Sequence, residues 1–413
     1  MLLLLLKEHL ILVRSDGNGG LIRYYYYDEI TWVVGALAVI WIAWMLIRRY
    51  RRSRAQHRPR RDAKHRVPRR VVKIKNELSS NYLAFGSGNN LHAIGIGLDA
   101  GGDYCIQFFV VDTTQEPWPG AATVPASYKG VPLALVQMPR ASLWVGVATE
   151  LASEQRQDCL PIRKYQEVMV GGVSGANMNL TGKNGTLGFF CRNKRGRSSG
   201  NVYVLSNAHV LVNLQNPAVS DRDLIVQPSP GEQWPNQSIG ALTDFAPLKF
   251  DNGDNPNFMD AAIATLKNSQ KFQAVLPSIG AVKGYAPKDD VAIGEAVCKF
   301  GRSTGRSDGR IYSTDLDVWI EYGVVGQAAF FKNQFLIEPA LPDETFVAPG
   351  DSGSLVMGAE NYAVGLLCGG GSQDLASPQP AANPNVPIIT SYGIANPIST
   401  VLDNLGIELL IDE

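Results

Sequence analysis

Cysteine is scarce in this chain, with five residues in 413. An odd number without any Cys-x-x-Cys pair argues against a disulfide framework and against a zinc site. The expectation is therefore a set of core thiols, with no metal. The five are Cys105, Cys159, Cys191, Cys298 and Cys368.

A phosphate-binding loop is also missing. Residues Gly301-Arg302-Ser303-Thr304-Gly305 lack the Gly-Lys-Ser/Thr ending that such a loop needs to hold a nucleotide. These glycines are expected to shape a hairpin instead. No cofactor is expected.

Histidine is equally scarce, and its scarcity narrows the choice of a catalytic base. Of five histidines, His57 and His65 fall in a basic tract, while His9 and His92 lack serine-rich or glycine-rich surroundings. His209 remains, near the end of the apolar run Val202–Leu211. An imidazole takes and returns a proton near neutral pH, so His209 is the candidate base. A core histidine bonded to backbone groups is the alternative.

A serine stands inside a glycine turn ahead of an apolar strand, in Ala348-Pro349-Gly350-Asp351-Ser352-Gly353-Ser354-Leu355-Val356. A serine hydroxyl attacks only when a base activates it and hydrogen-bond donors stabilise the developing oxyanion. Gly350 allows a sharp turn, so the amides of Gly350 and Ser352 are candidates for the oxyanion hole. A polar turn between two strands is the alternative.

Asp260 is the best candidate for the carboxylate that orients the histidine. It stands before small and apolar residues that read as a buried strand, whereas Asp244, Asp251 and Asp254 lie in polar loop-like sequence. A turn aspartate is the alternative. The order His209, Asp260, Ser352 is that of the chymotrypsin-type triad.

With these residues in place, the chain resembles the trypsin-like serine peptidases, and in particular the family that includes the plant Narrow-leaf proteins and bacterial relatives. Five blocks carry the resemblance over most of residues 165 to 410. They are Gly171–Ser174 with Gly185–Gly188, Leu205–Leu211, Met259–Ala264, Gly301–Gly305 and Pro349–Leu355.

The resemblance implies a mainly β fold: a chymotrypsin-like double β-barrel over residues 159–413, preceded by a small α+β domain. To this the uncharged run 30–47 adds a predicted N-terminal transmembrane helix. The first barrel would span about 165–275, the second about 285–395, and a C-terminal helix 396–406. Asn396 suits the N-cap of that helix and Pro397 its first position. The implied activity is peptide-bond hydrolysis through an acyl-enzyme, acting on a protein or peptide.

The chain also departs from secreted trypsin relatives, which carry cysteines beside the catalytic residues and need a cleavage that frees an Ile-Val-Gly-Gly-like start. Met169–Gly172 only faintly resembles that start, and no basic residue directly precedes it. Activity without cleavage is expected.

By position relative to Ser352, three residues are expected at the substrate pocket: Phe346 at its floor, and Gly369 and Gly370 along its wall. No carboxylate replaces Phe346, so an apolar residue is expected at the cleaved position. Core packing of Phe346 is the alternative.

Residues 30–47 contain no charge and are followed at once by an arginine-rich stretch. Eighteen helical residues span about 27 Å, so a single-pass membrane helix is predicted, with a buried soluble helix as the alternative. Residues 48–75 hold 14 Lys/Arg against one Asp. The positive-inside rule places this tract, and the catalytic body after it, on the cytoplasmic side, with residues 1–29 as a short outer segment.

The basic tract 48–75 is predicted to be a disordered tether attracted to anionic headgroups, and nucleic-acid binding is not expected because the folded body is acidic. Residues 76–158 are predicted to form the small α+β domain, with strands near 92–98, 104–111 and 128–136. This domain would position substrate, mediate self-association into a homo-oligomer, or serve only as structure.

Two functional classes stay open on the sequence. The first is an active, membrane-tethered serine endopeptidase. The second is a catalytically silent relative that uses the same fold for binding or assembly at the membrane. The intact set of His209, Asp260 and Ser352 with its glycines favours the first.

Overall fold

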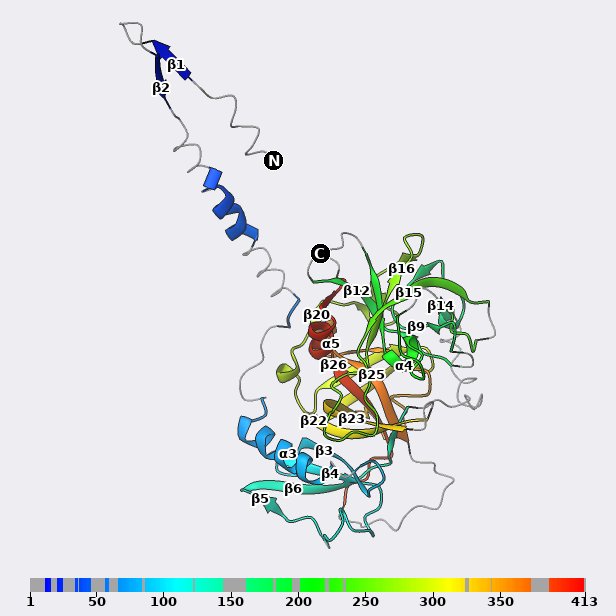
Figure 1. The fold of residues 1–413 in the computed structure, drawn as a ribbon. Helices are drawn as coiled ribbons and strands as arrows, with labels where there is room; N and C mark the ends of the chain where they lie inside the picture. Colours follow the sequence, from blue (N-terminus) through cyan, green and yellow to red (C-terminus); the bar gives the residue numbers. More distant parts are fainter. Residues whose placement is uncertain are drawn as a thin grey trace. The chain divides into compact units, whose positions relative to one another are not determined.

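The structure is a computed structural model of all 413 residues, and its chain divides into two units, 1–56 and 57–413 (Figure 1). The structure describes residues 12–15, 21–24, 34–35, 37–45, 56–58, 66–83, 86–121, 123–143, 161–180, 183–194, 201–219, 223–232, 235–323, 327–342, 344–372 and 386–411.

The first unit contains an antiparallel pair of strands, β1 (Leu12–Ser15) and β2 (Leu21–Tyr24), and a helical stretch at 34–35 and 37–45. Among the described residues, no helix is both long and apolar enough to cross a bilayer. The membrane helix predicted over 30–47 is therefore not found there, and its two ends lie outside the described residues.

The centre of the second unit is a closed ring of six antiparallel strands. In ring order they are β21 (Ala296–Gly301), β24 (Leu355–Met357), β25 (Tyr362–Ser372), β26 (Ser391–Pro397), β23 (Gln327–Pro339) and β22 (Gly305–Tyr322). The additional pairing of β21 with β22 closes the ring, because Gly301 and Gly305 turn the chain tightly back on itself. The glycines of the 301–305 block thus shape a hairpin, as predicted.

A second sheet of seven strands carries the other half of this unit. Its order is β10 (Ala176–Asn177), β14 (Leu224–Gln227), β15 (Gln237–Phe245), β16 (Ala262–Leu266), β13 (Tyr203–Ser206), β12 (Phe189–Asn193) and β27 (Ile407–Leu409). Within the described part of the chain, no pairing joins β10 to β27. The fold is mainly β, as predicted, but the strand pairing does not confirm a double barrel.

Short elements complete the second unit. They are β5 (Ser127–Tyr128), β7 (Ala141–Ser142), β8 (Val168–Met169), β9 (Val173–Ser174), β11 (Thr186–Leu187), β17 (Lys271–Phe272), β18 (Val275–Leu276), β19 (Gly280–Ala281), β20 (Gly284–Tyr285), α4 (Ala208–Leu211), α5 (Ile398–Asn404) and three 3₁₀ turns, Pro161–Arg163, Lys288–Asp290 and Ala359–Asn361.

The residues predicted as a small α+β domain do not form a separate sheet. Helix α3 (Arg69–Tyr82) packs on β3 (Leu91–Leu98) and β4 (Tyr104–Val110), which pair with each other, and β6 (Val131–Gln137) pairs with β4. The long strand β22 then pairs with β3, so these strands extend the ring's sheet. The predicted strands exist, but their pairing with β22 merges them with the sheet of the ring.

The prediction of a disordered tether over 48–75 is wrong at its end. Helix α3 begins at Arg69 and buries Val71, Ile74 and Leu78 against the sheet. Lys75 lies 2.8 Å from Asp317, and both side chains are fully buried. Burial lowers the pKa of Lys75, while the neighbouring Asp317 opposes that shift. An apolar face and an acidic partner hold this basic segment in place.

The prediction for the C-terminal helix is partly wrong. Helix α5 lies within the predicted range, at Ile398–Asn404, and buries Ile398, Val401 and Leu402, but its N-cap is Pro397. Asn396 belongs instead to strand β26, where its side chain is fully buried.

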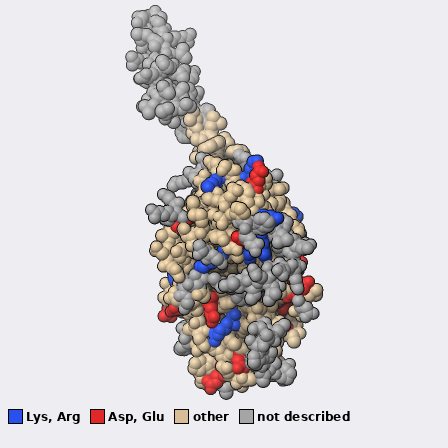
Figure 2. All heavy atoms as spheres, turned by 90° about the vertical axis from the view of Figure 1, so that its right-hand side faces the viewer, with Lys and Arg blue, Asp and Glu red and all other residues tan. Residues whose placement is uncertain are grey.

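The cysteines of the described residues are free thiols, and Cys159 lies outside those residues. Burial raises the pKa of Cys105 to about 11 and also raises the pKa of Cys368 well above that of a free thiol. Figure 2 shows acidic and basic side chains interspersed over the face that it displays. Exposed pairs such as Arg306–Asp308, at 3.0 Å, contribute little to stability.

Candidate active site

His209 lies on α4, a single helical turn that follows strand β13 directly. Strand β13 sits inside the seven-stranded sheet, between β12 and β16. Because β13 is held on both sides, the turn after it has a defined position, and the side chain of His209 keeps only 9% of its surface exposed. The structure therefore places this histidine on a rigid support.

Asp260 lies next to His209 in space, 51 positions later in the chain. Its Oδ2 is 2.5 Å from Nδ1 of His209 and its side chain is completely buried. Its Oδ1 accepts hydrogen bonds from the amides of Ala208, at 2.6 Å, and His209, at 3.2 Å. The pairing of Ser206 with Ala262 on β16 explains the approach. The structure thus brings the predicted base and acid together.

Two residues that the sequence analysis missed complete the surroundings of Asp260. The hydroxyl of Tyr322, at the end of β22, donates to Asp260 Oδ2 at 2.8 Å. Burial and the charge of Asp260 raise the pKa of Tyr322 well above that of a free phenol, so the hydroxyl stays a donor. Asn396 accepts from the Asp260 amide at 3.0 Å and donates to its carbonyl at 3.3 Å. The carboxylate is therefore fixed from both sheets.

The serine turn adopts a backbone that only glycine accommodates easily. Gly350 has φ +96° and Gly353 has φ +95°, both in the left-handed region. A Cβ on Gly353 would also lie 2.1 Å from the carbonyl oxygen of Thr186. Among the hydrogen bonds of the described residues, none occupies the amides of Gly350 or Ser352. These amides suit the predicted oxyanion hole.

Thr186 links the serine turn to the histidine segment. Its amide donates to the Ser352 carbonyl at 2.9 Å, and its hydroxyl donates to the Gly350 carbonyl at 2.8 Å. Its own carbonyl accepts from the hydroxyl of Ser206, at 2.7 Å, three residues before His209. Ser352 and His209 are thus fastened to one residue of β11. Within the described chain, no hydrogen bond joins Ser352 to His209 directly.

Asp351, beside the candidate nucleophile, forms a buried ion pair with Lys299 of β21. The Nζ–Oδ2 distance is 2.8 Å and neither side chain is exposed. The amide of Ser303 donates to Oδ1 at 2.8 Å, and the hydroxyl of Thr304 donates to Oδ2 at the same distance. Burial by itself raises the pKa of Asp351, but the charge of Lys299 and these hydrogen bonds lower it overall. The serine turn is anchored by an internal cation.

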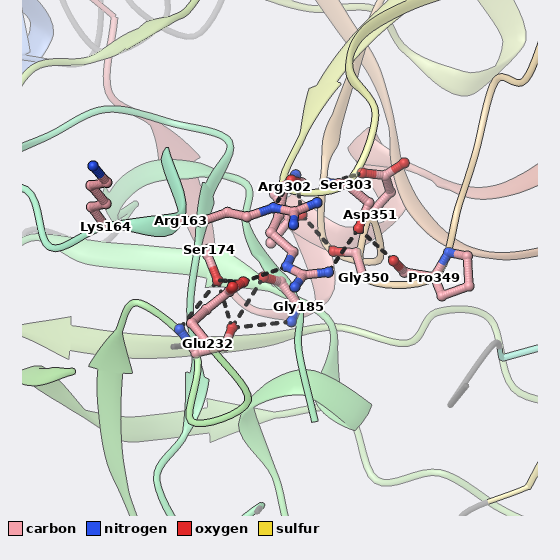
Figure 3. A network of polar contacts seen from close by, with 12 residues as sticks. Arg163, Lys164, Ser174, Gly185, Glu232, Arg302, Ser303, Pro349, Gly350 and Asp351 are labelled. Carbon is pink, nitrogen blue, oxygen red and sulfur yellow. Dashed lines mark hydrogen bonds and ion pairs between the residues drawn. The ribbon is translucent and has the colours of Figure 1, made fainter. Parts of the chain in front are cut away.

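A second polar network holds the outer side of the turn (Figure 3). Arg302 pairs with Glu232 at 2.6 Å, and Glu232 accepts from the hydroxyl of Ser174 at 3.0 Å. The amide of Arg302 donates to the Thr186 hydroxyl at 3.0 Å. The hydroxyl of Ser303 donates to the carbonyl of Pro349. The network therefore ties the loop after β14 to the serine turn.

Phe346, the predicted floor of the substrate pocket, is fully buried in a core cluster with Val297, Phe335 and Ile337. Phe346 is therefore a core residue, which was the alternative to a place at the floor of the pocket. Gly369 and Gly370 lie in β25, which passes the serine turn: the amide of Gly353 donates to the Leu367 carbonyl at 2.9 Å.

No signal in the sequence marks Lys299, Tyr322 or Asn396 as site residues. Each comes from a strand of the closed ring, 53, 30 and 44 positions from Ser352 respectively. Only the folded ring brings them to Asp260 and Asp351. In the part of the chain that the structure describes, no cluster of His, Cys, Asp or Glu has metal-binding geometry.

No protein-family model matches the chain. It is 28% identical over 210 residues to Protein NARROW LEAF 1 of Oryza sativa subsp. japonica, covering 45% of this chain and 34% of that protein. The chain thus spans about a third of the length of this curated relative.

Several solved structures are similar at 16% identity over 59% of this chain. They include a glutamic-acid-specific serine protease with a histidine triad in substrate binding (TM-score 0.38, 100% of that chain), Thermobifida fusca protease A (0.37, 100%) and Cellulomonas bogoriensis chymotrypsin (0.35, 98%).

Proposed function

We propose that this chain is a serine endopeptidase of the trypsin-like type, with His209, Asp260 and Ser352 as base, orienting acid and nucleophile. The observation that carries the proposal is the bond of His209 Nδ1 to a completely buried Asp260. A histidine held in this way presents its other nitrogen, Nε2, for proton transfer. Protein or peptide substrates are the expected class.

In the proposed reaction, His209 Nε2 takes the proton of the Ser352 hydroxyl while Oγ attacks the peptide carbonyl. The oxyanion is stabilised by the amides of Gly350 and Ser352. As the tetrahedral intermediate collapses, His209 gives the proton to the leaving amine and an acyl-enzyme remains. Water, deprotonated by the same histidine, then releases the acid product and restores Ser352.

The proposed enzyme needs no activating cleavage. In secreted trypsin relatives, a newly freed amino group pairs with the aspartate before the nucleophile. Here Lys299 supplies a positive charge to Asp351 from inside the chain. Val168–Met169, near the segment that faintly resembles an activation site, forms strand β8 and pairs with β17. The serine turn can therefore be ordered in the uncleaved polypeptide.

The membrane tether and the cytoplasmic side stay predictions from the sequence. They rest on the uncharged run 30–47 and on the excess of arginine directly after it. Extraction of the full chain from membranes by detergent but not by alkaline carbonate would support an integral anchor. Release by carbonate would contradict it.

A fluorophosphonate probe tests the proposed activity, because it reacts only with a serine that is activated as a nucleophile. We expect the full chain to be labelled at Ser352 and the Ser352→Ala variant to remain unlabelled. Ser80→Ala, at an exposed serine of α3, is the matched control and should keep its labelling. If the folded wild-type protein stays unlabelled, the proposed peptidase activity is refuted and the catalytically silent binding module is favoured.

Tyr322 is expected to act as a positioning residue for Asp260. Tyr322→Phe keeps the ring, which packs against Phe250 and Phe331, and removes only the hydroxyl. Loss of one hydrogen bond to a buried carboxylate should lower kcat about tenfold. KM should not change, since the hydroxyl does not face substrate.

Proton NMR gives a second readout for Tyr322→Phe. The Nδ1 proton of His209, shared with Asp260 at 2.5 Å, should resonate far downfield and shift in the variant. Equal kcat and an unchanged downfield resonance would show that the hydroxyl serves only packing.

A further inference from the structure

Strand β25 runs away from the serine turn, and an extended substrate would pair with one edge of this strand. Leu367 exchanges hydrogen bonds of 2.9 Å with Gly353 and Ser354, and Gly370 lies three residues further on, about 10 Å along the strand. An extended peptide pairing antiparallel with this edge would run toward Ser352, with the residues before its cleaved bond facing Gly369 and Gly370. Backbone pairing of this kind is a common mode of peptide recognition.

That edge already carries a segment of the same chain. Ser142 of β7 pairs antiparallel with Gly370, and the other side of Gly370 pairs with Gly393 of β26. Strand β7 also pairs with β22, through Ala141 with Ile320 and Ser142 with Glu321. It therefore fills the space between β25 and β22, and runs in the direction that a substrate would take.

Leu143 completes the resemblance to a bound peptide. Its amide donates to the Glu321 carbonyl at 2.8 Å, and its side chain is buried with Ile320 and Tyr322. Its Cδ2 would lie 3.5 Å from a Cβ placed on Gly369. The carbonyl oxygen of Ser142 would lie 3.3 Å from the same Cβ, so β7 packs directly on Gly369. Tyr322, a member of the same core cluster, also donates a hydrogen bond to Asp260.

The residues before β7 are fastened to the body. The carbonyl of Pro139 accepts from the hydroxyl of Tyr392 at 2.7 Å. Arg140 donates to the carbonyls of Gly88, at 3.1 Å, and Asn89, at 2.7 Å. These contacts fasten the chain directly before Ala141, Ser142 and Leu143, which lie on the strand edges.

We propose that residues 141–143 act as a built-in pseudosubstrate strand, which occupies the acyl side of the substrate site and must leave β25 before an extended peptide can bind. The inference rests on the proposed peptidase activity and names its regulation. Only molecules in which β7 has left β25 can bind an extended peptide. The apparent affinity for peptides is therefore the intrinsic affinity multiplied by the fraction of molecules in that state. A small electrophile that needs only Ser352 is not affected.

Leu143→Asp in the full chain tests the inference, because a buried carboxylate without a partner favours release of the segment. Leu98→Asp, at an exposed leucine of β3, is the matched control. For Leu143→Asp we expect kcat/KM on an extended peptide to rise about tenfold. The rate of fluorophosphonate labelling should stay within about twofold, because this small probe needs only Ser352 and not the edge of β25. Leu98→Asp should change neither.

A disulfide lock provides an independent variant should Leu143→Asp misfold. Ser142 and Glu321 are directly paired, so their side chains leave the same face and can be replaced by cysteines. In Ser142→Cys/Glu321→Cys, oxidation should abolish hydrolysis of the extended peptide and reduction should restore it, with labelling equal in both states. Peptide cleavage that persists in the oxidised form, or that falls in Leu143→Asp, overturns the pseudosubstrate role. Absence of labelling in every form overturns the peptidase itself.

Discussion

Replacement of Asp260 by asparagine should lower kcat by about 10⁴-fold, the size of this effect in serine proteases with the same triad. Asn keeps the shape of the side chain, but its amide cannot hold His209 in the tautomer that leaves Nε2 free to accept a proton. It also cannot stabilise the imidazolium that forms when Ser352 attacks. The effect should fall on kcat, because Asp260 is buried and does not contact substrate.

The measurement compares Asp260→Asn with Asp244→Asn, in which the same change falls on an exposed acid of β15. Hydrolysis of a peptide ester and the rate of fluorophosphonate labelling report catalysis, and thermal unfolding reports the fold. Asp244→Asn should leave all three unchanged. If Asp260→Asn keeps activity within tenfold of the wild type while folded, Asp260 is not the orienting acid.

Removal of the buried cation at Lys299 should cost about 3–5 kcal/mol of stability, since it leaves the charge of Asp351 buried without its partner. Lys299→Met keeps most of the volume of the side chain. The aspartate also orders the serine turn through Ser303, Thr304 and the Ala348 amide. The rate of fluorophosphonate labelling should therefore fall steeply even under conditions where the variant is folded.

Urea unfolding at neutral pH measures the loss in Lys299→Met. Lys271→Met is the control, because Lys271 pairs with Glu167 at 2.7 Å on the open surface and its removal should have no measurable effect. Adding Asp351→Asn to Lys299→Met should recover part of the stability, since the unpaired charge is gone, but not the labelling. Equal midpoints for Lys299→Met and Lys271→Met would show that this buried pair does not stabilise the fold.

The ion pair of Lys299 and Asp351 should also make the stability of the protein depend on pH. The pKa of Asp351 is lowered in the folded protein. Its contribution to stability is therefore complete above the ordinary carboxyl pKa and is lost as the pH falls through the lowered value. The wild type should lose this contribution on acidification, whereas Lys299→Met, which lacks it at neutral pH, should show a weaker dependence.

The candidate triad was predictable because each of its members has a local context in the sequence. His209 stands out among only five histidines, Ser352 lies in a turn that requires Gly350 and Gly353, and Asp260 precedes a buried strand. The structure confirms a mainly β fold and joins His209 to Asp260. The roles of the three as a working triad stay proposals for the labelling experiments to decide.

Two predictions from local sequence, the disordered tether and the start of the C-terminal helix, were partly wrong. The basic tract suggested a disordered tether, yet α3 begins inside it, since Asp317 neutralises Lys75 and an apolar face finds the sheet. Asn396 and Pro397 suggested a helix start, but the strand β26 continues through both. In each case a partner distant in sequence outweighed the local preference, and a local pattern carries no information about such a partner.

The sequence by itself determined the identities and order of the candidate catalytic residues, the glycines of the serine turn and the scarcity of cysteine. Only the tertiary structure decided that Tyr322 and Asn396 hold Asp260, that Lys299 neutralises Asp351, and that β7 covers Gly370. The physical reason is that turn geometry and strand preference depend on neighbours along the chain. Ion pairs, buried hydrogen bonds and strand edges instead depend on which segments the closed ring of strands brings together.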